Sequence, residues 1–540
     1  MDAPPTDRPD VTVVVATFRT GEPLLELVRA MERQSIGTDR LQLVTVDDGS
    51  GDDTPTTLRT LAADRPWMTV EEIPNSGWPC RPRNVGTGLA RGRWVLFMDH
   101  DDLLWPRALE AMVTAGDRAG ADVVLGKEVR TGGRTIGLDA FRASSDDAHV
   151  TRDHVFAVST PHRMYRTAFL EEHGIGFDES LRRLEDVHLL AAAEVHAPRT
   201  AVVADEACYQ WVIHGDNSSL RHPDPLEYFG AARRVLDEID RWPHPPEVRD
   251  DARRLLLRTM ILNRASPSGL PSWDPEYRRA FFDAARGVVL DRMPEHLDAG
   301  LGAHDRMRAA FFRSGDLDSV AAFGVPERIP TTRPQAVAVE RAGDRLRVTV
   351  RVRLLHGDGP DLVLERDGDR LLLRPHADVP EDLVRSRLDV TAELADARVD
   401  LLLVERSTNA EWFQPAAVTA GVVEGPDGPV WEATVVAEVD PSTARAGHPV
   451  GRGRWDLRLH TLVAGVDSRV LVRVDEDLAL PGPVPVGTDV AAPYRTQGGR
   501  LALHVTRPSG PKPTPAMSSP VSRARSFAGR LRRRLRRHLR

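Results

Sequence analysis

The sequence predicts an α/β domain with a mostly parallel sheet, then a helical segment, then an all-β region. Three observations predict this order. From Val11 to about Ala204, short apolar runs alternate with amphipathic stretches that have helical spacing. Residues 225–330 are rich in Arg, Leu, Ala and Asp and contain few β-branched residues. From residue 331 to 506, short alternating strands are separated by Gly, Asp and Pro turns.

The α/β domain is expected to occupy residues 1–224. Its apolar runs are short enough to be buried strands, and the segments between them have one apolar face. The predicted strands are Val11–Val15, Leu41–Val46, Met68–Ile73, Trp94–Met98 and Asp122–Leu125, and two of the predicted helices are Pro23–Gln34 and Pro106–Ala119.

The other segments follow from their own patterns. Residues 225–330 predict a helical linker subdomain. The strands beyond it predict two immunoglobulin-like β-sandwich modules, 331–430 and 431–506. Residues 507–540 begin with a tether rich in Pro and Ser and end in a basic tail with Leu every four positions. That tail is either an amphipathic helix on an anionic membrane or polymer, or a solvated cationic segment.

Composition excludes several classes of protein. A chain of 540 residues with 41% hydrophobic and 28% charged residues is typical of a globular protein with three or four domains. No apolar run is long enough to span a bilayer, and the N-terminus lacks a signal-peptide pattern. Two cysteines exclude a disulfide framework, so we expect a protein of the reducing cytoplasm. The net charge of −8 argues against nucleic-acid binding.

An acidic cluster follows the fourth predicted strand, where Val95–Met98 leads into Asp99-His100-Asp101-Asp102. If the backbone stays extended, Asp99 and Asp101 point to the same side and can face one cation. Their oxygen ligands suit Mn²⁺ or Mg²⁺. The alternative is a strand that ends in turn and helix-cap residues, and we expect that structural role for His100 and Asp102.

Two earlier segments carry further candidates. The first strand ends in Ala16-Thr17-Phe18-Arg19, and the second in Asp47-Asp48-Gly49-Ser50. The Asp48 carboxylate could accept a hydrogen bond from a base ring N–H, or it could form an Asx turn. The loop from Asn75 then leads into a helix with Arg83, which is either an anion site or a solvated surface arginine.

In this order the motifs resemble glycosyltransferase family 2 of the GT-A fold. The matching segments are Ala16–Phe18, Asp47–Ser50, Arg83-Asn84-Val85-Gly86 and Asp99–Asp102. The resemblance covers about the first 220 residues and departs from the family at Arg19, where an Asn is common. It implies that the donor nucleotide is bound by Ala16, Thr17, Phe18, Asp48, Asn75 and Arg83, and that Asp99 and Asp101 hold the sugar diphosphate through Mn²⁺ or Mg²⁺.

The acceptor half of such a site follows downstream. The segment from His162 leads to Glu185-Asp186, which resembles the Glu-Asp pair of the family. The resemblance makes Asp186 the general base; the alternative is a carboxylate that stabilises a helix N-terminus. Further on, His214 is a candidate metal or diphosphate ligand or a structural histidine, and Ser218 and Ser219 are candidate phosphate ligands.

The order of the domains is similar to that of bacterial wall-teichoic-acid glycosyltransferases. This resemblance implies an inverting, metal-dependent transfer from a UDP-sugar, with N-acetylglucosamine the best guess. The acceptor would be a polyol-phosphate or other anionic envelope polymer or its precursor. It also implies a homotrimer held by the β modules, and the basic tail would place the protein on the inner face of the plasma membrane. Two alternatives are an envelope-polymer scaffold without activity, and a nucleotidyltransferase, for which Val11–Gly21 lacks a Gly-rich phosphate loop.

Overall fold

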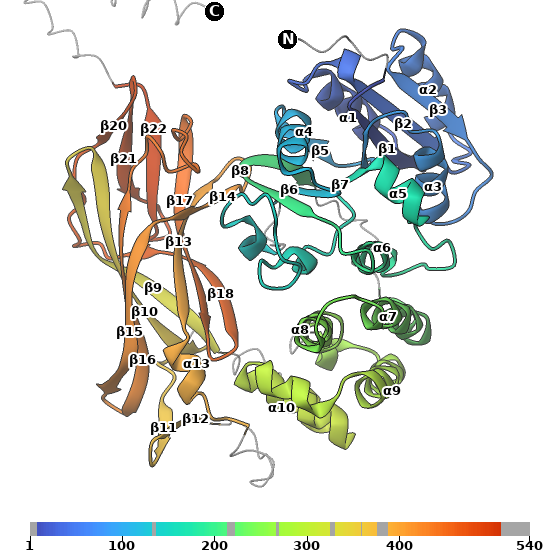
Figure 1. The fold of residues 1–540 in the computed structure, drawn as a ribbon. Helices are drawn as coiled ribbons and strands as arrows, with labels where there is room; N and C mark the ends of the chain where they lie inside the picture. Colours follow the sequence, from blue (N-terminus) through green and yellow to red (C-terminus); the bar gives the residue numbers. More distant parts are fainter. Residues whose placement is uncertain are drawn as a thin grey trace, which may run out of the picture.

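The structure is a computed structural model that describes residues 8–131, 137–212, 222–265, 269–323, 330–357, 359–374 and 387–508. It has an α/β domain, a helical part and a strand-rich part (Figure 1). The α/β domain and the helical part lie on one side of the strand-rich part, which forms an elongated body. Within these residue ranges, no helix is both long and apolar enough to cross a membrane.

The α/β domain is built on an eight-stranded sheet with the order β3-β2-β1-β4-β7-β6-β8-β5. The first four strands in this order are parallel, as the sequence predicted, whereas β7 is antiparallel to both its neighbours. The strands are β1 (Val11–Thr17), β2 (Leu41–Asp47), β3 (Met68–Glu72), β4 (Trp94–Asp99), β5 (Leu103–Leu104), β6 (Val123–Arg130), β7 (Arg163–Arg166) and β8 (Thr200–Trp211).

Both faces of this sheet are covered by helices, which explains why its central strands are apolar throughout. Successive side chains of a strand point to opposite faces, so Val13 and Val15 of β1 belong to one core and Val14 belongs to the other. The first core is closed by α1 (Pro23–Glu32), α2 (Thr54–Ala63) and α4 (Ala108–Ala119). The second is closed by α3 (Cys80–Gly88), α5 (Thr167–His173) and α6 (Glu185–Glu194).

The carboxyl ends of β1, β2 and β4 meet at one edge of the sheet. Ala16 is in register with Val46 of β2 and with Asp99 of β4. From β1 the chain passes through α1 to β2 and then to β3 on one side of β1, and α3 then carries it back over the opposite face to β4 on the other side. Ligands of open α/β sheets bind at such a point, where the strand order reverses.

The helical part packs against the second core of the α/β domain. Asp224 caps α7 by accepting a hydrogen bond from the Glu227 backbone N–H (2.9 Å), and the Trp242 indole donates to the Ala191 carbonyl of α6 (2.9 Å). The elements are α7 (Pro225–Asp240), α8 (Pro246–Leu256), a π-helical segment (Leu257–Leu262), α9 (Pro275–Arg292), α10 (Ala303–Ser314) and α11 (Leu317–Phe323).

The strand-rich part has two main sheets. One has the order β15-β16-β10-β9-β19, and the other has the order β14-β13-β17-β22-β21-β20, with β18 paired to β17. The elements are β9 (Pro330–Ala342), β10 (Arg345–His356), β11 (Leu364–Asp367), β12 (Arg370–Leu373), α13 (Thr391–Ala395), β13 (Arg398–Glu405), β14 (Glu411–Gln414), β15 (Ala416–Gly425), β16 (Gly428–Val439), β17 (Gly453–Val463), β18 (Val466–Leu471), β19 (Arg473–Val474), β20 (Val484–Val486), β21 (Asp489–Arg495) and β22 (Leu501–Thr506).

The predicted division into modules 331–430 and 431–506 is wrong. Strands on both sides of this boundary share both sheets, because β10 pairs with β16 and β13 pairs with β17. Their apolar side chains also belong to one core. The alternating pattern identified strands, but strand partners are set by hydrogen bonds between distant segments, which the pattern does not specify. The immunoglobulin-like class stays a prediction, and the predicted tail lies outside the described residues.

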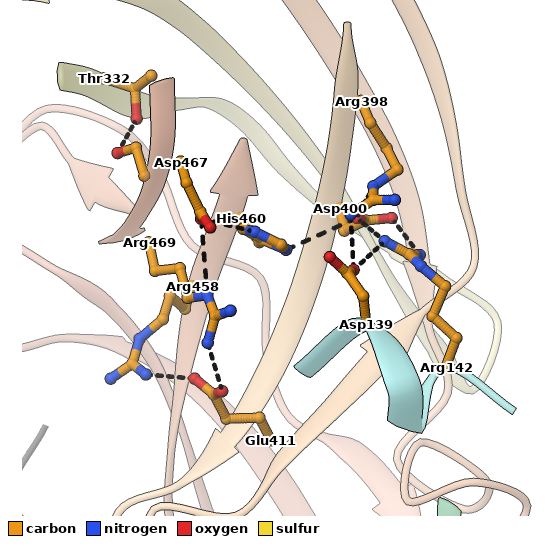
Figure 2. A network of polar contacts seen from close by, with 11 residues as sticks. Asp139, Arg142, Thr332, Arg398, Asp400, Glu411, Arg458, His460, Asp467 and Arg469 are labelled. Atoms are coloured by element: carbon orange, nitrogen blue, oxygen red, sulfur yellow. Dashed lines mark hydrogen bonds and ion pairs between the residues drawn. The ribbon is translucent and has the colours of Figure 1, made fainter. Parts of the chain in front are cut away.

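The strand-rich part contacts the α/β domain along β6. The Lys127 ammonium lies 3.6 Å from the centre of the Trp412 ring, and the Asn409 side chain donates to the Arg130 carbonyl (2.9 Å). Beside them, Asp139 and Arg142 form ion pairs with Arg398 and Asp400, and Figure 2 shows these pairs continuing through His460 to further charged residues of the strand-rich part. These contacts hold the two parts together.

Candidate active site

Asp48 lies directly after β2 and holds the following loop. Its two carboxylate oxygens accept hydrogen bonds from the backbone N–H groups of Ser76 (2.8 Å) and Gly77 (3.2 Å). The Asn75 side chain donates to the Asp48 carbonyl (2.6 Å). Gly49 has φ +65°, and a Cβ there would lie 2.7 Å from the Asn75 nitrogen, so only glycine fits this turn. The structure thus brings the predicted donor residues Asp48 and Asn75 together.

The end of β1 forms the neighbouring wall. Thr17 is buried and donates to the Val46 carbonyl (3.2 Å), whereas Phe18 is 40% exposed. Arg19 has φ +50°, its backbone N–H donates to the Ser50 hydroxyl (2.9 Å), and its guanidinium lies 5.0 Å from the Phe18 ring centre. Phe18 is therefore a partly exposed aromatic ring at this edge, and the Arg19 guanidinium lies over one of its faces.

Arg83 joins the two halves of the site. Its guanidinium, only 3% exposed, donates to Asp99 Oδ1 (2.7 Å) and to Asp186 Oδ1 (2.9 Å). It also lies 4.9 Å from the centre of the Phe177 ring. Burial alone would lower the pKa of Arg83, but the charges of Asp186 and Asp99 raise it. A permanently charged group thus links the end of β4 to the start of α6.

Asp186 is partly buried in the first turn of α6, next to Glu185. Burial raises the pKa of Asp186, and the nearby Arg83 partly offsets this effect. Burial and the Asp186 charge raise the pKa of Glu185 to about 7. Two adjacent carboxyl groups with raised pKa values make a suitable proton acceptor near neutral pH.

A group of three possible metal ligands lies beside Arg83. One ligand atom from each of Asp99, Asp102 and His162 fits within 4.8 Å of the others. His162 is 3% exposed; its Nε2 lies 3.5 Å from Asp99 Oδ2, and its Nδ1 lies 3.7 Å from Glu128 Oε1. Burial would lower the pKa of His162, but Asp99 and Glu128 raise it to about 10. The carboxylates of Asp99 and Asp102 suit Mn²⁺ or Mg²⁺. His162, whose buried ring nitrogens have no hydrogen-bond partner among the described residues, would add a ligand only after it loses its second ring proton.

Asp102 is the most buried member of this group, at 1% exposure. The Tyr209 hydroxyl donates to its Oδ2 (2.6 Å), and the Val212 backbone N–H donates to its Oδ1 (2.8 Å). Burial and the charge of Asp99 raise the pKa of Asp102 to about 8. Tyr209 also stacks on the His162 ring, with centroids 3.8 Å apart.

The backbone does not stay extended beyond Asp99. A turn at residues 100–101 is closed by the Asp102 N–H, which donates to the Asp99 carbonyl (3.3 Å). The reasoning that placed Asp99 and Asp101 on one side of a strand is therefore wrong. Within the described residues, the cluster contains Asp102 and His162 beside Asp99, and not Asp101. The role of Asp101 as a metal ligand stays a prediction.

Comparison with known proteins identifies the family. The family model "Glycosyl transferase family 2" matches residues 12–174. The succinoglycan biosynthesis protein ExoO of Rhizobium meliloti is 30% identical over 58% of this chain and 91% of its own length. This chain belongs to glycosyltransferase family 2.

Within family 2, the likeness extends to proteins that modify teichoic acid. The family model "Glycosyl transferase TarS linker domain" matches residues 225–324. Poly(ribitol-phosphate) beta-N-acetylglucosaminyltransferase TarS of Staphylococcus aureus is 28% identical over 57% of this chain, which spans 54% of the length of that relative. The structure of S. aureus TarS 1–349 in complex with UDP-GlcNAc covers 65% of this chain and 98% of its own, with a TM-score of 0.52 and 22% identity, so it shows the fold alone.

Most predicted site residues of this family-2 enzyme lie at one edge of the sheet. Ala16 and Thr17 end β1 and Phe18 follows it, while Asp48 follows β2 and Asn75 follows β3. Arg83, Asp99 and Asp186 form one connected group. Their individual roles stay predictions. His214, Ser218 and Ser219 lie outside the described residues.

Sequence reasoning missed three residues of the site. Glu128 reaches it from β6, Tyr209 from β8 and His162 from the segment before β7, and Asp102 contributes despite its predicted structural role. Glu128 is the one whose sequence context gives a signal, since a charged residue in the predominantly apolar strand β6 must find a buried partner.

Proposed function

We propose that this protein transfers a sugar from a UDP-sugar to a hydroxyl group of a polyol-phosphate wall polymer. Poly(ribitol-phosphate) is the acceptor, and N-acetylglucosamine is the sugar. The sequence likeness to TarS and the match to the TarS linker family support the acceptor. The fold shared with the UDP-GlcNAc complex of TarS is consistent with the donor.

One observation carries the proposal: Arg83 binds Asp99 and Asp186 at the same time. Asp99 ends β4 on the side of the loop held by Asp48, where the donor nucleotide would bind. Asp186 opens α6 on the other side, where an acceptor hydroxyl would approach. The double hydrogen bond therefore fixes the distance between the donor side and the base, and such positioning is a large part of catalysis.

The reaction is a single displacement that inverts the anomeric carbon. The acceptor oxygen forms a bond to the anomeric carbon while the bond to the diphosphate oxygen breaks. Asp186 takes the acceptor proton, and its raised pKa makes it a stronger base than an exposed carboxylate. Because Arg83 occupies Oδ1 of Asp186, the proton goes to Oδ2.

Asp99, Asp102 and His162 would hold Mn²⁺ or Mg²⁺, with Asp101 and His214 as the further predicted ligands. The ion would neutralise charge on the departing diphosphate. Phe18 would stack on the uracil ring, and Asp48 would orient it. Thr17 and Asn75 would shape that pocket, and Ser218 and Ser219 would bind phosphate.

We also infer a place and an assembly for the protein. It acts in the cytoplasm, where the basic tail binds the anionic inner face of the plasma membrane. A homotrimer forms through the strand-rich part. In support, β15 is an edge strand with almost every residue exposed, including the apolar Val418 and Val423.

Replacing the base tests the function. Asp186→Asn keeps the shape but not the proton affinity, so we expect transfer from UDP-GlcNAc to poly(ribitol-phosphate) to fall by about 10²–10⁴-fold. UDP binding, measured by calorimetry, should persist, and the exposed Glu172→Gln on α5 is the matched control. A wild-type rate of sugar transfer in Asp186→Asn would contradict the role of Asp186 as the general base. A wild-type protein that binds the polymer but transfers no sugar would favour the scaffold.

A further inference from the structure

A cavity of about 340 Å³ lies where the three parts of the molecule meet. Its walls come from residues 150–157 of the α/β domain, from α8, the π-helical segment and residues 300–305 of the helical part, and from Gly465 of the strand-rich part. We name it the junction cavity. Its volume falls within the range of about 300–1,000 Å³ that is usual for small-molecule sites. None of its lining residues belongs to the candidate active site.

Two glycines fix the junction cavity between the helical and strand-rich parts. A Cβ atom at Gly302 would lie 2.0 Å from the Cα atom of Gly465, so the two backbones are in direct contact. No other residue fits at Gly302 without moving one of the backbones. This cavity is therefore built into the packing of the three parts.

Three arginines line the junction cavity, and two of them have partners. Arg152 pairs with Asp153 (3.3 Å), and Arg254 pairs with Asp251 (2.6 Å). Arg258 is exposed and lines the cavity, and its guanidinium makes no hydrogen bond or ion pair with the part of the chain that the structure describes. One positive charge in this cavity thus remains without a close counter-ion.

The other polar groups that line the cavity form no ion pair with Arg258, although Asp305 attracts it from a longer distance. Asp305 pairs with Arg308 (3.3 Å), and burial raises the pKa of Asp305. Burial lowers the pKa of His154, and the nearby arginines Arg398, Arg142 and Arg258 add to this effect. A neutral imidazole can still donate or accept one hydrogen bond.

Arg258 also occupies an unusual segment of backbone. It belongs to the π-helical segment that continues α8, and π-helical turns occur frequently at functional sites. Its charge reaches His154 of the α/β domain, Asp305 of the helical part and Asp467 of the strand-rich part. An anion bound to Arg258 would therefore be felt by all three parts.

We propose that the junction cavity binds a phosphodiester group of the acceptor polymer, with Arg258 as its counter-ion. This inference rests on the proposed function, which makes the acceptor a chain of phosphates and polyols. A guanidinium matches the geometry of a phosphate group, and the imidazole of His154 can bind a polyol hydroxyl. A second contact away from the reacting hydroxyl raises the local concentration of a long polymer, while a single repeat gains nothing from it.

Comparing acceptors of different length tests the proposal. The measured quantity is the KM for poly(ribitol-phosphate) divided by the KM for a single ribitol phosphate. In Arg258→Gln we expect this ratio to rise about tenfold, because one charged hydrogen bond to the polymer is lost. Arg258→Lys should recover part of the ratio. Arg279→Gln, an exposed arginine of α9 that does not line the cavity, should keep the wild-type ratio. An unchanged ratio in Arg258→Gln would overturn the proposal.

Direct binding separates this inference from the proposed function. Calorimetry of the polymer with the full chain, without a donor, should show about tenfold weaker binding in Arg258→Gln even if no transfer is detected. If the wild type and Arg258→Gln bind the polymer equally well, the junction cavity is not a polymer site. This result would leave the transferase proposal intact. Inorganic phosphate at the same phosphate concentration should not displace the polymer. Full displacement would make this a site for free phosphate and would also overturn the proposal.

Discussion

Arg83 and Asp186 are joined by a hydrogen bond of 2.9 Å, and the same guanidinium holds Asp99 at 2.7 Å. Both carboxylates lie partly exposed at the sheet edge, whereas Arg83 is buried beneath them. Arg83 thus holds the carboxylates of Asp99 and Asp186 in fixed positions, where both face the same space. Without it, two like charges would lie close together in a partly buried site.

Arg83→Lys should therefore strongly lower the transferase activity, although the substitution keeps the positive charge. Lysine is a point charge and cannot present the planar fork that reaches two carboxylates at once. We expect kcat/KM to fall by at least about 10²-fold, because misplacement of about 1 Å has this effect. Steady-state kinetics measures the loss. Arg81→Lys on the exposed side of α3 is the control, and equal activity of the two variants would contradict this role of Arg83.

Glu128→Gln should weaken metal binding without touching a proposed ligand. The fully buried Glu128 carboxylate accepts a hydrogen bond from Thr160 and lies 3.7 Å from Nδ1 of His162, too far for a hydrogen bond but on the side from which a carboxylate orients a metal-binding histidine. Loss of such a group typically lowers metal affinity by about 10–100-fold. Titration of Mn²⁺, followed by the thermal unfolding temperature, measures this effect.

The control for Glu128→Gln is Glu171→Gln, which changes an exposed residue of α5. If Glu128→Gln and Glu171→Gln bind Mn²⁺ as tightly as the wild type, His162 is not held in the way proposed.

From the sequence we could predict which residues lie at the edge of the sheet, but not which buried residues lie beside them. Asp48 follows β2 and Asp99 ends β4, and parallel strands bring their carboxyl ends together whatever their order. His162 and Glu128 reach the same place because β7 inserts between β4 and β6. That insertion depends on pairing between segments far apart in the chain, and no local pattern encodes it. The assumption that Asp99 and Asp101 lie on extended backbone was wrong for a simpler reason: the backbone turns directly after Asp99.

Lys127 should make stability depend on pH. Burial lowers the pKa of Lys127 from 10.5 to about 7. Between these values the unfolded chain binds a proton that the folded chain does not, so folding becomes more favourable as pH rises from about 7 to 10.5, by at most about 1.4 kcal/mol per pH unit. In Lys127→Met, this contribution is absent. Denaturant unfolding of the wild type and of Lys127→Met at several pH values isolates this contribution. If the free energy of unfolding depends on pH in the same way in both proteins, the lowered pKa of Lys127 is contradicted.

Val418→Lys should disrupt the proposed homotrimer while leaving the fold intact. Val418 is 40% exposed on β15, an edge strand whose unpaired backbone groups can pair with another chain. A lysine there would place a charge in any contact between copies, and it replaces a side chain that is not part of the core. We expect the mass in solution, measured by light scattering, to fall to that of a monomer.

The matched control for Val418→Lys is Leu290→Lys, which changes an exposed apolar residue of α9 far from β15 in the fold. It should keep the wild-type mass. If Val418→Lys also keeps the wild-type mass, the copies do not meet along β15. If the wild type is itself a monomer over the concentration range measured, the homotrimer prediction fails for this chain.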